Sequence, residues 1–247
     1  MTIRIAMWSG PRNLSTAMMR SFGSRADTFV SDEPFYGAYL KTTRDPQPMI
    51  DEIIADMDCD WESVKNAQNG EAPDESAIWY QKHMPHHMEG PVDITDFPDT
   101  RHAFLIRDPV RVAASYANKR DEIRQEHLGV TRQREYFEKV ADQAGKAPPV
   151  VDSHDILLNP PVALKRLCGA LEIDYDPAML SWEKGPHEED GVWGSHWYDK
   201  VNASTGFGSA PDSMPELDEA YRKVADECRA DYEYLSQFAI ISKDRGG

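Results

Sequence analysis

The segment from Ser9 to Met19 combines a turn with residue types that bind anions. It reads Ser-Gly-Pro-Arg-Asn-Leu-Ser-Thr-Ala-Met-Met and lies between an expected strand and an expected helix. A turn there directs backbone N–H groups at a ligand, and the helix dipole adds partial positive charge. Ser15 and Thr16 add hydroxyl donors, and the Arg12 guanidinium presents a planar fork that suits phosphate or sulfate oxygens. The alternative is an ordinary Ser/Thr cap on an amphipathic helix.

A second segment, Phe104 to Tyr116, offers a cation and a hydroxyl. Arg107 follows an expected strand, and open α/β sheets bind ligands at that end of their strands. Ser115 lies eight residues further on, two turns into the next expected helix and on the same side as Arg111. This arrangement suits a second phosphate group. The alternative is a surface Arg–Asp pair that begins a helix.

The first turn differs from the phosphate-binding loop of nucleoside triphosphatases. That loop reads G-x-x-x-x-G-K-[ST], whereas the second Gly and the Lys are both absent here. A kinase or ATPase is therefore disfavoured. A small-molecule phosphotransferase that uses Mg²⁺ and ATP stays open as an alternative, as does a non-catalytic nucleotide-binding protein.

Strands and helices alternate along the chain, and this order positions both segments. Apolar patterns predict strands at residues 3–7, 28–31, 77–81, 102–106 and 148–151. Helices are predicted at residues 14–22, after 109, and at 49–68, 120–145, 163–171 and 217–238, with an irregular stretch at 181–213. The order implies right-handed crossovers and a three-layer α/β fold, a parallel sheet with helices on both faces. We expect one domain, residues 1–247, with a disordered tail at 242–247.

Charge and cysteine usage limit the partners. The net charge of −16 disfavours a nucleic-acid polymer, although residues 101–134 carry eight Lys or Arg against four Asp or Glu. Such a local patch suits a small anionic ligand, but a solvated helix face has the same composition. No apolar run could span a bilayer and no secretory signal begins the sequence. Cys59, Cys168 and Cys228 are scattered, as in a reducing cytoplasm, so we expect a cytoplasmic protein; a homo-oligomer stays open.

Together the two segments resemble the cofactor-binding elements of the sulfotransferase family. There a P-K-x-G-T-x or P-R-S-G-[ST]-[ST] turn holds the 5′-phosphosulfate of 3′-phosphoadenylyl sulfate, and an R-[DN]-P-x-x-x-x-x-S run holds its 3′-phosphate. Leu14 replaces the internal Gly of that turn, and Ala17 stands where many cytosolic members carry a Trp that stacks on adenine. The resemblance implies a P-loop NTPase-like fold with helical insertions. It implies these cofactor-binding residues: Pro11, Arg12, Asn13, Leu14, Ser15, Thr16, Arg107 and Ser115.

The same resemblance implies a catalytic base. The run from Tyr80 to Met88 is similar to the K-T-H-x-P stretch of cytosolic sulfotransferases, shortened by one residue, which makes His83 the base and Lys82 its neighbour. An unperturbed His titrates near ~6.5 and suits that role. One alternative is a solvated histidine in a loop. The other is a metal site that includes His83 and the His pair at 86–87, although no pattern of Cys or carboxylate residues supports such a site.

Glu33 is a rival for the same role. The run from Ser31 to Tyr36 resembles the Glu-Pro element of carbohydrate and bacterial sulfotransferases, where the Glu after this strand is the base. The alternative is an acidic turn that ends a strand. From the sequence, either His83 or Glu33 removes the proton.

Aromatic and glycine residues between 181 and 213 are candidates for a lid. Phe207 or Trp197 could stack on the adenine or on the acceptor, and packing against the sheet edge is equally compatible with these residues.

The resemblance implies transfer of a sulfuryl group from 3′-phosphoadenylyl sulfate to a hydroxyl or amine of a small-molecule acceptor, which leaves adenosine 3′,5′-bisphosphate. Arg12 and the backbone of the turn would stabilise charge on the transferring group, and Arg107 with Ser115 would recognise the 3′-phosphate. The donor carries its own activated group, so we expect that no metal is required.

Overall fold

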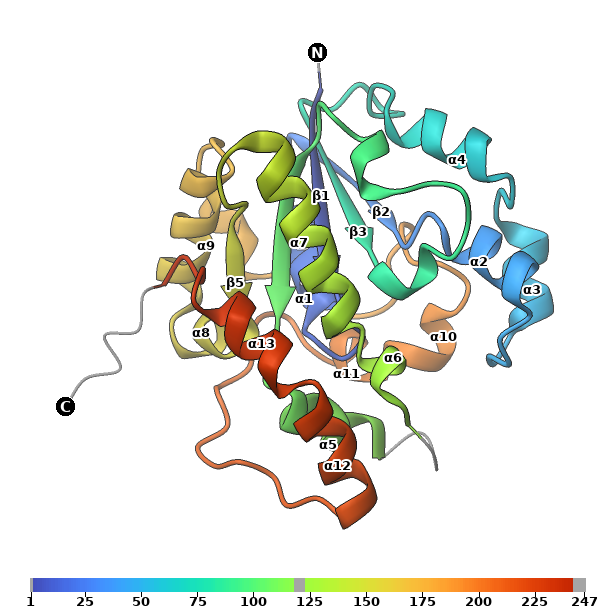
Figure 1. Cartoon of the computed structure of the whole chain (residues 1–247). Coiled ribbons are helices and arrows are strands. Elements are labelled where there is room, and N and C mark those ends of the chain that lie inside the picture. The colour runs from blue at the N-terminus through green and yellow to red at the C-terminus, as the bar shows by residue number, and fades with distance from the viewer. Residues whose placement is uncertain (1, 118–122, 242–247) are drawn as a thin grey trace.

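One parallel sheet carries the fold. The computed structural model describes residues 2–117 and 123–241, and within them five strands pair in the order β2-β3-β1-β4-β5 (Figure 1). All four pairings are parallel. The strands are β1 (Ile3–Ser9), β2 (Thr28–Asp32), β3 (Ile78–His83), β4 (Arg101–Ile106) and β5 (Val150–Asp152). The predicted parallel α/β fold is confirmed.

Alternate side chains of the central strand enter two cores. Ala6 and Trp8 pack with residues of α7 and α13, whereas Ile5 and Met7 pack with residues of α1 and α9. Figure 1 shows α7 and α13 in front of the sheet and α1 behind it. Because strand side chains alternate in direction, one buried strand supplies both cores of a three-layer fold.

Helices fill the connections between strands. No helix in the described part of the chain is long and apolar enough to cross a membrane. The longer helices are α1 (Ser15–Gly23), α2 (Tyr36–Thr43), α3 (Ile50–Asp56), α4 (Trp61–Gln68), α5 (Pro109–Ala117), α7 (Val130–Ala144), α8 (Ser153–Leu158), α9 (Pro160–Ala170), α12 (Glu219–Glu227) and α13 (Arg229–Ser236). Shorter ones are α6 (Gln125–Leu128), α10 (Gly194–Trp197), α11 (Asp199–Asn202) and the 3₁₀ turns η1 (Pro85–His87), η2 (Ile94–Asp96) and η3 (Pro177–Leu180).

The helix predicted at 49–68 is two helices, α3 and α4. Met57 is extended, with φ −100° and ψ 152°, and ends α3. The Asp60 carboxylate then accepts a hydrogen bond from the Ser63 N–H at 2.8 Å and starts α4. A local side-chain cap therefore overrides the continuous helical pattern.

Other boundaries also differ from the prediction. The helix predicted at 217–238 is divided at Cys228 into α12 and α13, and the irregular stretch at 181–213 contains α10 and α11. Helix α2 follows Glu33 and was not predicted. Residues 118–122, which include the start of the helix predicted at 120–145, and the tail 242–247 lie outside the described residues.

Gly10 permits a close approach between the loop after β1 and the end of α6. A Cβ built on Gly10 would lie 2.2 Å from the Leu128 carbonyl oxygen. Gly129, the residue after Leu128, adopts φ +72° and lies against the Gly10 Cα. The absence of side chains on both glycines lets two backbones meet beside the carboxyl end of β1.

We predict that Gly10→Ala lowers the free energy of unfolding by about 1–3 kcal/mol, because the new methyl group collides with backbone that must move. Gly169→Ala in α9 is the matched control: a Cβ there meets nothing within 4 Å. The control is expected to gain up to ~1 kcal/mol from helix propensity. Urea denaturation measures both, and equal shifts in the two variants would contradict the steric account.

Candidate active site

The turn between β1 and α1 is held in place from outside. Arg107 donates from Nη1 to the Arg12 carbonyl at 2.6 Å. Ser153 donates from Oγ to the Asn13 carbonyl at 2.7 Å. The Asn13 amide donates in turn to the Leu105 carbonyl at 3.3 Å. The turn is therefore fixed by residues of β4 and of the segments that follow β4 and β5.

Two non-glycine residues of this turn have left-handed backbone. Arg12 adopts φ 62° and Leu14 adopts φ 74°. Leu14 stands where the sulfotransferase turn has its Gly, which is the residue that adopts this conformation most easily. The turn therefore keeps the backbone shape of a glycine turn, at a cost of order ~1 kcal/mol. No side chain among the described residues caps the N-terminus of α1, so its N–H groups remain available to a ligand.

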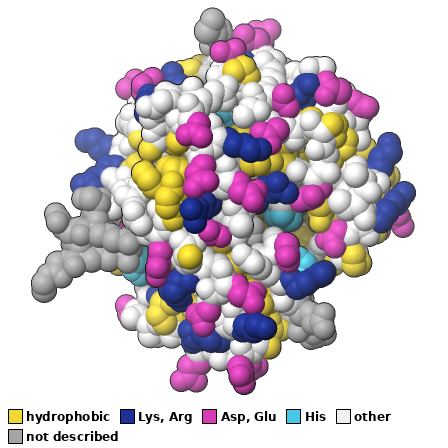
Figure 2. All heavy atoms as spheres, in the orientation of Figure 1, with side chains coloured by type: hydrophobic (Ala, Val, Ile, Leu, Met, Phe, Trp, Pro, Cys, Tyr) yellow, Lys and Arg dark blue, Asp and Glu magenta, His cyan; other side chains and the backbone are white. Residues whose placement is uncertain are grey.

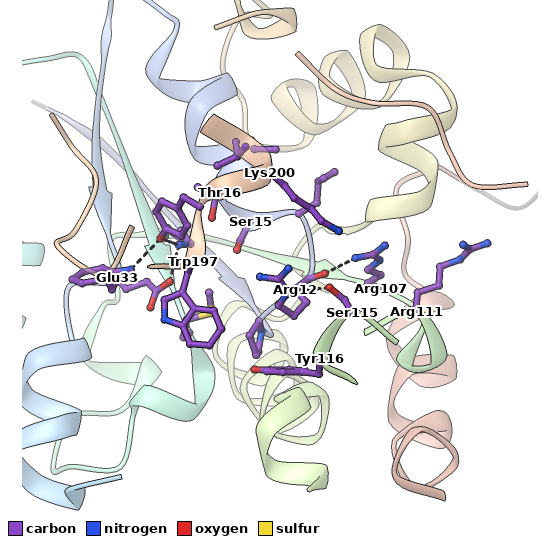
Figure 3. Close-up of a pocket in the computed structure, with 18 of the residues that line it drawn as sticks. Arg12, Ser15, Thr16, Glu33, Arg107, Arg111, Ser115, Tyr116, Trp197 and Lys200 are labelled. Carbon is purple, nitrogen blue, oxygen red and sulfur yellow. Dashed lines mark hydrogen bonds and ion pairs between the residues drawn. The ribbon is translucent and has the colours of Figure 1, made fainter. Parts of the chain in front are cut away.

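Three arginines gather beside this turn. Arg12 donates from Nε to the Ser115 hydroxyl at 3.0 Å, and Arg107 and Arg111 line the same pocket. Figure 3 shows all four side chains at one end of the pocket. Burial lowers the pKa of Arg107, and the charges of Arg111 and Arg12 lower it further. None of the three arginines forms an ion pair with another described residue, so a bound anion would relieve their mutual repulsion.

The opposite end of the pocket contains a buried ion cluster around Lys82. Its ammonium lies 2.7 Å from Asp32 Oδ1, 2.7 Å from Glu33 Oε1 and 2.7 Å from the Tyr198 hydroxyl. Tyr198 also donates to Asp32 Oδ2 at 2.7 Å. The register places Lys82 beside Asp32 at the ends of β3 and β2. Glu33 then adopts φ 48°, and both neighbouring carboxylates reach the same ammonium.

The charges in this cluster depend on one another. Burial lowers the pKa of Lys82, but the attraction of Asp32 and Glu33 outweighs it, and the pKa lies well above its usual value. Burial raises the pKa of Asp32, with the charge of Lys82 acting against it. Lys82 is therefore a fixed cation that holds Glu33 through one carboxylate oxygen.

His87 borders the second oxygen of Glu33. The imidazole stacks against both Tyr36 and Tyr39, with ring centroids 4.3 and 4.9 Å away. Its Nδ1 lies 3.8 Å from Glu33 Oε2. Burial, followed by the charge of Lys82, lowers the pKa of His87 well below its usual value. Because the ring is neutral, His87 adds a polar atom beside Glu33 without adding a second cation.

Both ends open into one cavity of about 740 Å³. This volume falls in the range of small-molecule sites. Loops after β1, β2, β3 and β4 supply its floor, and the segment from 182 to 215 supplies a wall. The arginines with Ser115 and the cluster around Glu33 thus face one space, with Ser15 and Thr16 also on its surface.

A family model described as "Sulfotransferase domain" matches residues 3–226. The chain belongs to the sulfotransferase family. Two solved structures share the fold: a sulfotransferase from Alicyclobacillus acidocaldarius (TM-score 0.55, 11% identity, covering 95% of this chain and 96% of that one) and the sulfotransferase domain from the curacin biosynthetic pathway (TM-score 0.50, 13% identity, covering 92% and 97%). Membership of the family confirms the resemblance seen in the sequence.

Curated relatives extend well beyond this chain. Branched-chain-amino-acid aminotransferase-like protein 2 of Arabidopsis thaliana is 35% identical over 213 residues, which cover 86% of this chain and 37% of that protein. Branched-chain-amino-acid aminotransferase-like protein 1 of the same plant is 35% identical over 212 residues, which cover 85% and 37%. The chain therefore spans little more than a third of the relatives it matches.

Most residues expected to bind the sulfotransferase cofactor lie in the pocket. The lining includes all of them except Asn13, whose side chain donates a hydrogen bond to the Leu105 carbonyl and so holds the turn against β4. Phe207 also lines the pocket, with its ring packed edge-on against Trp182 at 5.1 Å between centroids. Trp197 lies at the same end as Glu33 in Figure 3.

The structure does not bring His83 to the pocket. Strand β3 continues to His83, two residues beyond the predicted end, so Lys82 and His83 point to opposite faces of the sheet. His83 is 2% exposed and stacks on Trp8, with ring centroids 4.6 Å apart. The expectation that His83 follows the strand and faces the site is therefore corrected: His83 is a core residue outside the cavity lining, whereas Glu33 lines the cavity.

Sequence reasoning missed three residues of the site. Tyr198 forms hydrogen bonds with Lys82 and Asp32, which are more than a hundred residues away in the sequence. Ser153, the first residue of α8, holds the turn after β1. Asp32 had a usable signal in the sequence, because it directly precedes Glu33 at the end of a predicted strand. For Tyr198 and Ser153 no local signal existed.

We predict that His83 makes the enzyme less stable in acid. Burial, followed by the neighbouring His102, lowers the pKa of His83 to about 3, whereas in the unfolded chain it is ~6.5. Between these values the unfolded state binds a proton that the folded state excludes, so stability falls as pH falls, by about 1.4 kcal/mol per pH unit. The measurement is urea denaturation at pH 7.5 and at pH 5.0. The free energy of unfolding should fall less between these two pH values in His83→Phe than in the parent.

The control for this experiment is His196→Phe, which changes an exposed histidine. It should lose as much stability on acidification as the parent. If His83→Phe behaves like His196→Phe, the buried imidazole does not carry the pH dependence.

Proposed function

We propose that this sulfotransferase moves a sulfuryl group from 3′-phosphoadenylyl sulfate to the hydroxyl of a small-molecule acceptor, with Glu33 as the base. The observation that carries the proposal is the division of a single cavity into a cationic end, with Arg12 and Arg107, and an end with a carboxylate at Glu33. A donor with several anionic groups fits the first end, and an acceptor that must lose a proton fits the second.

The residues present fit the donor. The uncapped N-terminus of α1 and the hydroxyls of Ser15 and Thr16 would hold the phosphosulfate. Arg107 and Ser115 would hold the 3′-phosphate. Burial and then the like charges of Arg111 and Arg12 lower the pKa of Arg107, so a bound phosphate would stabilise its charged form. Phe207 would supply an aromatic face for the adenine, in place of the Trp that is absent at Ala17.

When bound, the donor supplies a sulfuryl group that forms a new O–S bond with the acceptor oxygen, while its bond to phosphate breaks and the electron pair leaves on that phosphate. Glu33 Oε2 takes the hydroxyl proton, because Oε1 is already bonded to Lys82. Lys82 and Asp32 fix the position of this carboxylate. Arg12 faces the leaving phosphate and offsets the negative charge that accumulates there.

We predict that adenosine 3′,5′-bisphosphate binds and that Arg107→Ala weakens binding at least about tenfold, a loss of ~1.4 kcal/mol or more. Calorimetric titration measures both, with ADP as the comparison ligand. Arg132→Ala, which removes a surface arginine paired with Glu89, is the matched control and should bind normally. Binding of ADP with Mg²⁺ but not of the bisphosphate would overturn the assignment and favour a phosphotransferase.

We predict that Glu33→Gln lowers the turnover rate by at least about 100-fold, since the acceptor loses its base. The assay is transfer of ³⁵S from labelled donor to a panel of one alkanol, one phenol, one hexose and one amino alcohol. Affinity for the bisphosphate should stay within threefold of the parent, because Glu33 lies at the other end of the cavity.

Glu172→Gln removes an exposed carboxylate, 71% accessible, and serves as the control for turnover. If Glu33→Gln turns over at the parental rate, the acceptor's proton goes to another group.

A further inference from the structure

The acceptor end of the cavity is enclosed by aromatic rings. Tyr36, Tyr39, Trp193 and Trp197 belong to one apolar cluster, and all four line the cavity. Tyr36 meets Trp193 edge-on at 5.1 Å between centroids. Figure 3 shows the Trp197 indole at the same end of the pocket as Glu33. The negative faces of aromatic rings attract cations, and Trp attracts them most strongly.

Asp45 brings a negative charge to the same end. It lines the cavity and hydrogen-bonds with Tyr39, whose pKa is raised by burial and then by the charge of Asp45. Tyr39 stacks on His87, and His87 Nδ1 lies 3.8 Å from Glu33 Oε2, so Asp45 and Glu33 belong to one group of contacts. The Gln47 amide donates to Asp45 Oδ2 at 2.5 Å and fixes the carboxylate.

The two carboxylates that line the cavity differ in whether a nearby cation neutralises their charge. Glu33 is paired with Lys82, whereas Asp45 forms no ion pair with any described residue. Asp45 is about half-buried, so its charge is only partly screened by water. The arginines stand at the other end of the cavity, beside the phosphate turn. An unbalanced carboxylate among aromatic rings is an environment that favours an organic cation.

We propose that the acceptor is a small cationic amino alcohol whose ammonium group binds between Asp45 and the ring of Trp197 while its hydroxyl reaches Glu33. This inference rests on the proposed sulfuryl transfer and adds the class of acceptor. The hydroxyl proton passes to Glu33 and the oxygen forms the O–S bond, while the bond between sulfur and the donor's phosphate oxygen breaks and adenosine 3′,5′-bisphosphate leaves with the electron pair. The ammonium group is unchanged. The separation of charges also selects orientation, because an ammonium is repelled from the arginine end.

A pair of isosteric alcohols tests the charge alone. Choline and 3,3-dimethyl-1-butanol differ in that a quaternary nitrogen replaces a quaternary carbon. Each is titrated into the enzyme saturated with adenosine 3′,5′-bisphosphate, so the measurement does not depend on turnover. We expect choline to bind at least tenfold more tightly than the neutral alcohol, and ethanolamine to exceed 1-propanol by a similar factor.

Three variants at two positions test which residues cause the preference for the cation. Asp45→Asn keeps the size of the side chain and should remove most of the preference for choline. Trp197→Leu should reduce it, and Trp197→Phe, which restores an aromatic face, should recover part of it. Affinity for the bisphosphate should be unchanged in all three, which also shows that each variant is folded.

The outcomes separate the two proposals. Failure of the bisphosphate to bind overturns the proposed donor. Normal bisphosphate binding with equal affinity for choline and its neutral isostere overturns only the cationic acceptor, and so does a preference that survives in Asp45→Asn. Tighter binding of the neutral alcohol or of an anionic analogue such as glycerate would assign the aromatic end to a different class of acceptor.

Discussion

The ammonium group of Lys82 must be neutralised, because it lies in a part of the protein from which water is excluded. Asp32 and Glu33 supply the negative charge, and the Tyr198 hydroxyl accepts a third hydrogen bond from the ammonium. Removing one partner of such a buried pair generally costs about 3–5 kcal/mol, since the other charge is left uncompensated. That requirement joins strands β2 and β3 to the segment that contains Tyr198, and it fixes the carboxylate of Glu33 as a consequence. The position of the candidate base therefore follows from the burial of one lysine.

At the opposite end of the cavity, charges of the same sign lie close together. Arg12, Arg107 and Arg111 lie close together and form no ion pair with another described residue. Burial and then the charges of Arg111 and Arg12 lower the pKa of Arg107, with Asp152 and Asp108 acting against them. Hydrogen bonds from Arg12 to the Ser115 hydroxyl and from Arg107 to the Arg12 carbonyl keep these two side chains in place. A site of this kind is prepared for an anion, because the ligand supplies the charge that the protein lacks.

Between the two ends, the turn after β1 shows how backbone shape can persist when the usual residue is replaced. Leu14 adopts the left-handed conformation that Gly would adopt, and neighbouring elements hold it there through Arg12 and Asn13. Leu14 also packs partly against the core beneath α1, contacts that a glycine would not make. The strain and the packing act in opposite directions, and together they allow a sulfotransferase turn without its internal glycine.

The sequence by itself determined the parallel α/β fold, the turn after β1 and the Arg107–Ser115 segment, because each depends on local patterns of apolar residues and on spacing within a few helical turns. Tertiary structure decided which of two adjacent polar residues enters the site. Lys82 and His83 follow one another on a strand that runs further than its pattern predicts, so one faces the cavity and the other packs on Trp8. It also decided the contribution of Tyr198 and Ser153, whose partners are distant in sequence. Strand length and long-range pairing are set by packing across the whole sheet, and no short window of residues contains that information.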